Sequence, residues 1–317
     1  MTGAAQVVTL GETMAMMRSV QPGPLAHAGT LETGIGGAES NVAIGLRRLG
    51  IDVAWAGRVG SDSLGELVLR ELRAEGLRVL ARTDSGAPTG LMIKERRTSE
   101  TVKVWYYRAG SAGSRLSWED VPADAVAEAR LLHITGITPA LSATAAEAVR
   151  FAVDCAHDAG TLVSLDLNYR SALWSREDAA PVLRKLVADA DVVFAGEDEA
   201  AIALGSSAPP LLLAARLADM GPEQVVIKLG ADGCTALLDG GEYSQDAVPI
   251  HALDTVGAGD AFVAGYLAEL LAGADPQARL ATAVRTGAFA CLTAGDWEGL
   301  PTRADLQALG AAEGVQR

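Results

Sequence analysis

Residues 254–271 read DTVGAGDAFVAGYLAELL, the stretch around which the rest of this chain is interpreted. Asp254 to Val256 is predicted to end a strand, Gly257 to Asp260 to form a tight turn, and Ala261 to begin a helix. The two glycines of the turn permit positive φ and bring a bound group close to backbone N–H groups. Because the amino end of a helix carries positive partial charge, this turn suits a phosphate group.

Asp260 lies inside this anion-binding turn, where a carboxylate would repel a phosphate that was only held there. Such an acid is expected if it accepts the proton of a hydroxyl that attacks a phosphoryl group. For the isolated turn, a simple strand-to-helix connection with an aspartate cap is an alternative, since G-x-G patterns are common. The stretch therefore indicates phosphoryl transfer with Asp260 as the proton acceptor.

The composition limits the classes of protein that this chain can belong to. It has 317 residues, of which 49% are hydrophobic and 4% aromatic, enough to bury a sizeable core in a layered α/β fold. Its 26 basic and 40 acidic residues give a net charge of 26 − 40 = −14. A nucleic-acid partner is not expected, because it requires a basic surface.

The location of the protein is inferred from features that are missing from the sequence. The three cysteines, at 155, 234 and 291, form no CxxC pair and have no metal-ligand spacing, which favours free thiols in a reducing compartment. The first 17 residues do not resemble a signal peptide, and no apolar run is long enough to span a membrane. We expect a cytoplasmic protein with no membrane partner.

Strands and helices are expected to alternate along most of the chain. This rhythm is typical of a parallel sheet covered by helices on both faces, so we expect a single α/β domain spanning residues 1–317. The predicted strands are 6–10, 53–59, 131–135, 162–167, 192–195 and 225–228, followed by an antiparallel pair at 234–238 and 242–249. The predicted helices are 38–49, 62–76, 142–159, 176–188, 197–204, 211–220, 276–294 and 302–309.

Two further segments, about 12–36 and 88–110, are predicted to form a small β-flap. The second contains a hairpin of strands 89–97 and 101–108, joined by a turn at 98–100. Period-2 alternation places aromatic residues on both faces of this hairpin, so one face is expected to cover a ligand or another chain. An ordinary edge hairpin is the alternative. Because exposed edge strands usually need covering, a homo-oligomer, at least a dimer, is expected.

Three predicted strand ends carry polar residues, at 166–170, 228–233 and 254–260. Open α/β sheets bind ligands beyond the carboxyl ends of their strands, so these residues are candidates for one site. Arg170 could bind a carboxylate or phosphate, or could form a surface ion pair. The acids 197–199 begin a helix, where the helix dipole alone favours them.

Several motifs together resemble the pfkB (ribokinase-like) carbohydrate kinases, and within them the 2-keto-3-deoxygluconate kinases. The resemblance covers the whole chain. It is carried by GGAESN (36–41), VWYYRAGSAGS (104–114), ITGITPALS (134–142), SLDLNYRSALW (164–174), VVIKLGADG (225–233), DTVGAGDAFVAGYL (254–267) and GDWEGLP (295–301). It implies a ribokinase-like three-layer α/β/α fold with a β-flap lid, and Mg²⁺- and ATP-dependent phosphorylation of the terminal hydroxyl of a sugar acid.

The resemblance also implies a role for individual residues. Asp260 is similar to the proton acceptor, and Gly257, Ala258 and Gly259 to the anion hole. The substrate set is Gly37, Ala38, Asn41, Tyr106, Tyr107, Arg108, Arg170, Asp260 and Asp296. The ATP set is Asn168, Arg170, Lys228, Gly230, Ala231, Gly233, Gly257 and Gly259, and Glu199 would bind Mg²⁺ through water. From the residues alone, two arginines suit a carboxylate better than a neutral sugar.

Three positions depart from the pattern of these kinases. Gly196 replaces the first residue of an Asn-x-x-Glu motif that retains Glu199, Met92 stands where related sequences have a substrate-contacting tyrosine, and Val284 stands where an asparagine commonly approaches adenine. These departures bear on sugar selectivity and nucleotide preference and leave the reaction class as predicted.

Other functions remain open from the sequence. A kinase of the same family could act on fructose, ribose, another keto-deoxy acid or a nucleoside. A protein of the same fold could bind sugar or nucleotide without catalysis, although the intact Asp260 argues against this. A dinucleotide-dependent oxidoreductase is disfavoured, because no G-x-G-x-x-G follows the first predicted strand.

Overall fold

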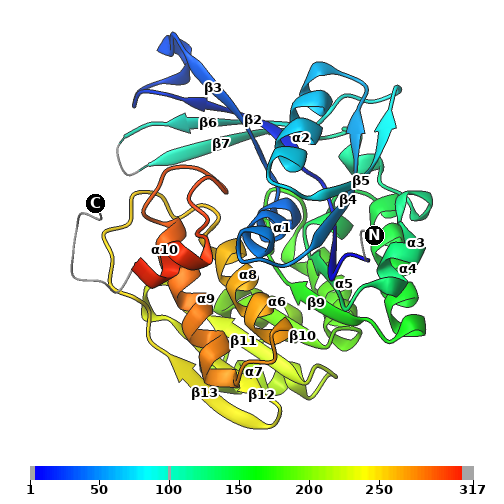
Figure 1. The fold of residues 1–317 in the computed structure, drawn as a ribbon, viewed down its shortest axis with the longest axis vertical. Coiled ribbons are helices and arrows are strands. Elements are labelled where there is room, and N and C mark those ends of the chain that lie inside the picture. Colours follow the sequence, from blue (N-terminus) through cyan, green and yellow to red (C-terminus); the bar gives the residue numbers. More distant parts are fainter. Residues whose placement is uncertain (1–3, 99–100, 309–317) are drawn as a thin grey trace.

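The computed structural model describes residues 4–98 and 101–308. Its larger sheet has nine strands and forms the centre of the molecule (Figure 1). In spatial order these are β13 (Gly241–Gln245), β12 (Cys234–Leu238), β11 (Gln224–Lys228), β10 (Val192–Gly196), β9 (Leu162–Asp166), β8 (Leu131–Thr135), β1 (Val7–Leu10), β4 (Val53–Gly60) and β5 (Arg78–Asp84).

Neighbouring strands from β11 to β5 run parallel, and only β12 and β13 are added antiparallel. The prediction of a mostly parallel α/β sheet is confirmed. Strand β5 was not predicted. It is the edge strand, and its sequence RVLARTD is half-exposed, so it lacks the continuous apolar run that identifies a buried strand.

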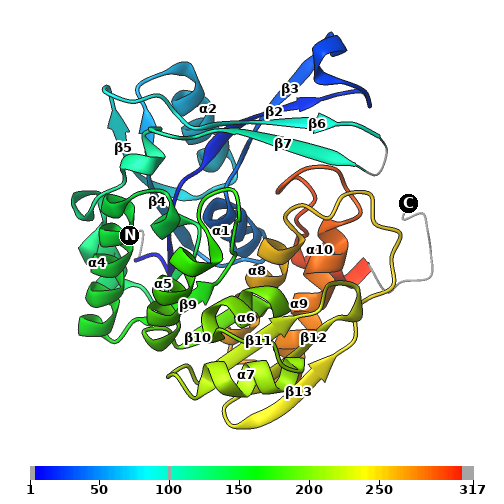
Figure 2. The same ribbon diagram turned by 180° about the vertical axis from the view of Figure 1, so that it is seen from behind.

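Helices cover both faces of this sheet (Figures 1 and 2). One face packs against α1 (Ala38–Arg48), α2 (Ser63–Ala74), α8 (Ala258–Leu271), α9 (Pro276–Ala290) and α10 (Arg303–Ala308). The other face packs against α3 (Ala123–Glu128), α4 (Ala143–Ala159), α5 (Arg176–Ala188), α6 (Glu197–Leu204) and α7 (Pro210–Ala218). Short 3-10 turns lie at Leu25–His27, Gly113–Arg115, Trp118–Asp120, Thr138–Ala140 and Gly230–Asp232.

The strands divide their side chains between two hydrophobic cores. Val7 and Trp55 point to the α1/α8 side, whereas their chain neighbours Val8 and Ala54 point to the α4/α5 side, and all four side chains are buried. Because successive side chains of a strand alternate between faces, a sheet covered on both sides needs apolar residues at every position. This is why the sequence shows continuous apolar runs in the central strands.

A second, four-stranded sheet lies apart from the first, at one end of the molecule (Figure 1). In spatial order it comprises β3 (Leu31–Gly36), β2 (Met14–Ser19), β6 (Leu91–Arg96) and β7 (Val102–Tyr107). Strands β6 and β7 form an antiparallel pair, and two of the three predicted turn residues between them, 99 and 100, lie outside the described residues. The end of the last predicted helix, at 309, also lies outside them.

The segment before α8 differs from the prediction. Asp254 to Val256 does not end a strand, because β13 already ends at Gln245 and the residues from 246 to 257 are irregular. The backbone N–H groups of Leu253 and Asp254 donate instead to the carbonyl of Cys291, just after α9, at 2.8 and 3.3 Å. Helix α8 begins at Ala258, three residues before the predicted start, so Asp260 lies in its first turn.

Within the described residues, no helix combines the length and the apolar character that crossing a membrane requires.

Candidate active site

A cavity of about 590 Å³ lies between the small sheet and the carboxyl ends of the parallel strands. Its walls come from segments far apart in the sequence: the small sheet, the start of α1, the loops after β8 and β9, and the start of α8. The residues proposed for the substrate that line it are Gly37, Ala38, Asn41, Tyr106, Arg108, Arg170, Asp260 and Asp296. Tyr107 does not line it, and its side chain is 61% exposed on β7.

Asp260 is buried at the start of α8 and faces α1. Asn41 donates from Nδ2 to Asp260 Oδ2 over 2.7 Å. Burial raises the pKa of the Asp260 carboxyl to about 7; the hydrogen bond from Asn41 opposes this shift, the charge of Asp166 adds to it, and Arg170 and Lys228 oppose it. A carboxyl whose pKa lies near neutral pH is suited to accept a proton in a reaction.

The turn that precedes Asp260 leaves several backbone donors free. Gly257 has φ 78°, a left-handed conformation, and a Cβ there would lie 2.0 Å from the carbonyl oxygen of Asp296. The N–H groups of Gly257, Gly259 and Asp260 have no acceptor among the described residues. Free N–H groups at the positive end of a helix form an anion-binding site.

The two predicted arginines differ in their surroundings. Arg108 follows β7 and is paired with Glu12, whose Oε2 lies 2.8 Å from Nε and 2.6 Å from Nη2. Arg170 follows β9, and its side chain has no partner within residues 4–98 and 101–308. Its positive charge nevertheless acts to lower the pKa of Asp260. Of the two arginines, Arg170 is therefore the one whose guanidinium is free of an ion pair within the described residues.

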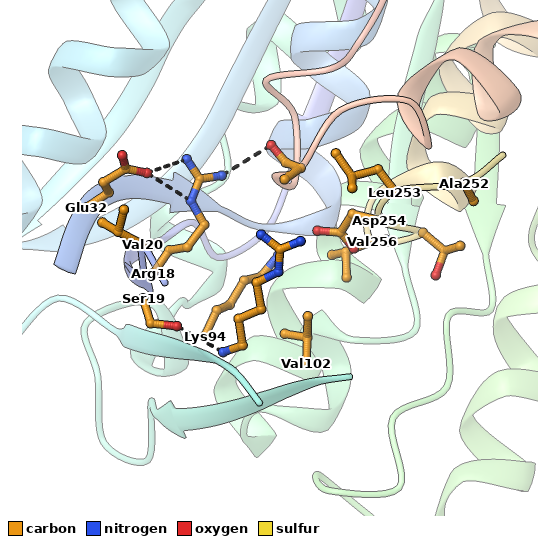
Figure 3. A pocket seen from close by; sticks show the side chains of 13 residues that line it. Arg18, Ser19, Val20, Glu32, Lys94, Val102, Ala252, Leu253, Asp254 and Val256 are labelled. Atoms are coloured by element: carbon orange, nitrogen blue, oxygen red, sulfur yellow. Dashed lines mark hydrogen bonds and ion pairs between the residues drawn. The ribbon is translucent and has the colours of Figure 1, made fainter. Parts of the chain in front are cut away.

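Asp296 forms a buried ion pair with Lys94 of β6, so the small sheet is joined by this pair to the loop after α9. The two side chains are 7% and 4% exposed. Lys94 lines a second cavity of about 710 Å³ (Figure 3). Asp296 lines the first cavity. In the second cavity Arg18 is likewise paired, with Glu32 at 2.9 Å.

Lys228, one of the residues predicted for ATP, lies beside the start of α8. Lys228, at the end of β11, is paired with Asp166 of β9 at 2.7 Å, and its Nζ would lie 3.8 Å from a Cβ on Gly259. Burial alone would lower the pKa of Lys228, but the charges of Asp166, Glu199 and Asp260 outweigh it and raise that pKa. A lysine bordered by three acids stays charged at neutral pH.

Glu199 connects two of these segments. Its Oε2 accepts from the N–H of Gly196 at 2.7 Å, and its Oε1 accepts from the N–H of Tyr169 at 3.0 Å. It therefore holds the loop after β9 against the start of α6. The described residues contain no cluster of three or more His, Cys, Asp or Glu side chains arranged around a metal position.

The remaining residues of the predicted ATP set lie in two turns. Gly230 and Ala231 form the 3-10 turn after β11, with Gly230 at φ 60°. Gly233 closes that turn at φ 92°, where a Cβ would lie 2.0 Å from the carbonyl of Gln245. Asn168 is buried with φ 38°, an unusual conformation for a residue other than glycine. The turn after β11 and the turn after β9 thus each contain residues with positive φ.

Three acidic or basic residues of the site were missed by sequence reasoning: Glu12, Glu39 and Lys94. Asp166 was among the strand-end candidates at 166–170, but no role was predicted for it. Glu12 and Asp166 stand at the ends of predicted strands, and this position was a usable signal. Glu39 is buried beneath the cavity and accepts from Thr135 at 2.7 Å and Thr138 at 2.6 Å; burial raises the pKa of its carboxyl. No local sequence pattern predicts the partners of Glu39 or Lys94, because those partners are distant in sequence.

The three departures from the family pattern lie in different places. Met92 is buried on β6 and lines the first cavity. Val284 is buried in α9 and packs in the core of that face of the sheet. Gly196 is the last residue of β10 and donates to Glu199. Only Met92 thus borders the candidate sugar position.

Residues 4–303 match the family model described as pfkB family carbohydrate kinase. Two curated relatives extend over nearly the whole chain. The chain is 35% identical over 310 residues to a 2-dehydro-3-deoxygluconokinase of Bacillus subtilis, with 96% of this chain and 95% of the relative covered. It is 36% identical over 296 residues to a 2-dehydro-3-deoxygalactonokinase of Haloferax volcanii, with 92% of each covered.

The fold is also similar to that of a solved structure, a PfkB protein from Polaromonas sp. JS666. The TM-score is 0.88 and the sequence identity 36%, with 96% of this chain and 100% of that chain covered.

Proposed function

The chain belongs to the pfkB family of carbohydrate kinases and has its ribokinase-like fold, and we propose that it phosphorylates the terminal hydroxyl of 2-keto-3-deoxygluconate with ATP. The observation that carries this proposal is the presence of Arg170 and Arg108 in the same cavity as the buried Asp260. A cavity of about 590 Å³ is in the size range that holds a small ligand.

The carboxylate of the sugar acid binds Arg170. This guanidinium forms no ion pair within the described residues, and Asp260 is the carboxyl group with which its charge interacts, whereas Arg108 is paired with Glu12. Arg108 still has Nη1, which has no partner in the described part of the chain. Arg170 therefore supplies the charge that selects an acid, and Arg108 supplies a directed hydrogen bond.

Asp260 accepts the proton of the terminal hydroxyl as the oxygen attacks phosphorus. Asn41 holds Asp260 Oδ2 in position, which leaves Oδ1 to face the hydroxyl. The free N–H groups at the start of α8 stabilise negative charge on the transferring phosphoryl group. Met92, Tyr106 and the rest of the small sheet would exclude water from this position, which limits hydrolysis of the donor.

The nucleotide would be held by Lys228, the glycine turn from Gly230 to Gly233, Asn168 and the start of α8. These residues fit phosphate groups, because they combine positive-φ turns with a charged ammonium that lies beside the unpaired N–H groups at the start of α8. Mg²⁺ that arrives with ATP, as in other kinases of this family, supplies positive charge to the phosphates.

Glu199 fits an outer position around that Mg²⁺, through water, because both of its oxygens already accept backbone hydrogen bonds. A hydrated Mg²⁺ bound mainly through phosphates needs few protein ligands. The acids around Lys228 are of the right chemistry for such an ion.

We further infer that the segments 12–36 and 88–110 act as a lid on a single domain and that two copies associate through them. Strand β7 is an edge of the small sheet, has no further strand beside it in the described part of the chain, and exposes Trp105 and Tyr107. A second copy would cover this edge. Sedimentation or light scattering of the purified protein tests this; a monomer at micromolar concentration contradicts it.

A cytoplasmic location is proposed from the use of ATP and from the three free cysteines in the described residues. The net charge of −14 supports small-molecule partners rather than nucleic acid.

The test is ADP release by purified protein with Mg²⁺ and ATP, measured for 2-keto-3-deoxygluconate, its galactonate epimer, gluconate, fructose and ribose. Preference for the keto-deoxy acids supports the proposal. Preference for fructose or ribose would keep the kinase and reject the acid substrate, and no turnover with any sugar would favour a binding protein. The galactonate epimer is the second candidate, because a relative of 36% identity is named for it.

A further inference from the structure

The chain passes between the large and the small sheet four times. The crossings are residues 11–13, residue 37, residues 85–90 and residues 108–112. The third and fourth are joined directly, since the N–H of Ala112 donates to the carbonyl of Pro88 at 2.8 Å. Any movement of the small sheet as a lid must change the backbone at these four places.

Glu12 lies in the first crossing and contacts the fourth through its side chain. Its Oε2 forms an ion pair with Arg108 and lies 2.8 Å from Nε and 2.6 Å from Nη2 of that side chain. Its Oε1 accepts from Ser111 Oγ at 2.5 Å. The side chains of Glu12 and Arg108 are 1% and 10% exposed, so water competes little with these contacts.

Glycines make room for Glu12 at the other crossings. A Cβ on Gly90, in the third crossing, would lie 2.6 Å from Glu12 Oε1, and a Cβ on Gly113, just after the fourth, 2.2 Å from Glu12 Cγ. A Cβ on Gly37, the second crossing, would lie 2.3 Å from the carbonyl oxygen of Glu12. All four crossings therefore meet around this one residue.

We propose that Glu12 is a positioning residue that holds Arg108 for the substrate and ties the direction of that guanidinium to the position of the lid. This inference rests on the proposed function, in which Arg108 binds the sugar acid. Two donors of Arg108 are fixed on Glu12, so the third, Nη1, has one direction when the crossings are packed together. If the lid opens, the Glu12–Arg108 geometry changes and the donor loses that direction.

The same contact affects the charge of the cavity. Glu12 forms an ion pair with Arg108, whereas Arg170 forms none with the described residues. Removing the charge of Glu12 would leave both guanidinium groups of the cavity without an ion-pair partner.

The experiment is a double-mutant cycle of Glu12→Gln and Arg108→Gln, read out as kcat/KM and as the Kd of the sugar acid by calorimetry without ATP. We expect Glu12→Gln to lower kcat/KM by about 10-fold or more, because a misplaced contact group misaligns the hydroxyl. In the Arg108→Gln background, Glu12→Gln should lower kcat/KM by no more than about 2-fold, because Glu12 acts through Arg108. Equal losses in both backgrounds would overturn the proposal.

Glu95→Gln is the matched control. Glu95 is also a buried carboxylate of the small sheet, paired with Arg97 at 3.1 Å and bonded to Trp105 Nε1 at 3.0 Å, but it does not line the cavity. We expect it to leave Kd and kcat/KM unchanged. A loss equal to that of Glu12→Gln would mean that both variants only weaken the lid.

Glu12→Gln leaves a buried guanidinium without its partner and could be too unstable to assay. In that case the double variant, which removes both charges, is compared with Arg108→Gln alone; a further loss of about 10-fold or more would overturn the proposal. The cycle is run with whichever sugar the unmodified protein prefers. A neutral preferred sugar would reject the proposed substrate, whereas additivity would reject the role of Glu12, so the two failures are distinguishable.

Discussion

Asn41 and Asp260 lie 219 positions apart in the sequence and are joined by a hydrogen bond of 2.7 Å from the Asn41 amide to Asp260 Oδ2. Both residues are buried, and Asn41 Oδ1 is a buried oxygen without a partner in the described structure. Buried polar atoms are rarely left unpaired, so this oxygen is a candidate acceptor for a substrate hydroxyl. The pair thus links the first turns of α1 and α8 at the proposed reaction centre.

Asp260→Asn removes the proposed proton acceptor while keeping the shape of the side chain. We expect kcat to fall by about 10²–10⁴-fold, the range for loss of general base catalysis. The affinity for an ATP analogue should stay nearly the same, because Lys228 and the free N–H groups at the start of α8 remain. Steady-state kinetics and calorimetry check this, and near-normal turnover would contradict the role of Asp260.

The pH profile should show the titration of Asp260. Burial raises the pKa of this carboxyl to about 7 in the free protein, and only the deprotonated form accepts a proton. We therefore expect log kcat/KM to fall with a slope near one as pH decreases below about 7. Asn41→Ala removes a hydrogen bond that lowers this pKa. The fall in log kcat/KM should therefore begin at a higher pH in that variant. If log kcat/KM of the unmodified protein falls only near pH 4, the prediction is contradicted.

Arg170→Ala should reduce the preference for acids over neutral sugars. A hydrogen bond to a charged group contributes about 1.5–3 kcal/mol, so the ratio of kcat/KM for the keto-deoxy acid to that for fructose should fall about 10- to 100-fold. Arg176→Ala, at an exposed arginine outside the cavity, is the control and should change nothing. If Arg170→Ala lowers kcat/KM equally for the keto-deoxy acid and for fructose, Arg170 does not select the carboxylate.

Gly257→Ala should disrupt the turn before α8. The alanine would have to adopt φ 78° and would place its Cβ 2.0 Å from the Asp296 carbonyl. Gly273→Ala separates these effects, because Gly273 has φ 74° with no atom near its Cβ position. We expect the control to cost about 1 kcal/mol of unfolding free energy and Gly257→Ala clearly more, with loss of kcat. If urea unfolding gives equal losses of free energy for Gly257→Ala and Gly273→Ala, the added Cβ at position 257 does not clash with the Asp296 carbonyl.

Lys94→Met should destabilise the protein by about 3–5 kcal/mol, because it leaves the buried Asp296 carboxylate unpaired. Adding Asp296→Leu should recover much of that loss, since no unpaired charge then remains. Lys103→Met on β7 is the control: this lysine lies 3.9 Å above the Trp105 ring and is exposed. Urea unfolding monitored by circular dichroism measures all of these variants, and an unchanged midpoint in Lys94→Met would refute the buried pair.

Much of the architecture was predictable because its signals are local. Continuous apolar runs such as VVTL at 7–10 identify strands buried on both faces, and helix caps such as Asp62, which accepts from the N–H of Gly65, mark boundaries. Edge strand β5 was missed because it is only half-buried and has no such run. Helix α8 starts earlier than predicted because contacts with the loop after α9 hold Gly257 and the residues before it.

The α/β class, the β-structure of the segments 12–36 and 88–110, and a glycine turn followed by a helix near Asp260 could be predicted from the sequence, because these depend on residue types a few positions apart. The pairing of charged side chains, in contrast, depends on the tertiary structure. Glu12 pairs with Arg108 across 96 residues and Lys94 with Asp296 across 202, contacts that no local pattern encodes. They depend on the order of the strands and on the packing of the small sheet against the large one, and they leave Arg170 as the unpaired guanidinium facing Asp260 in the described cavity.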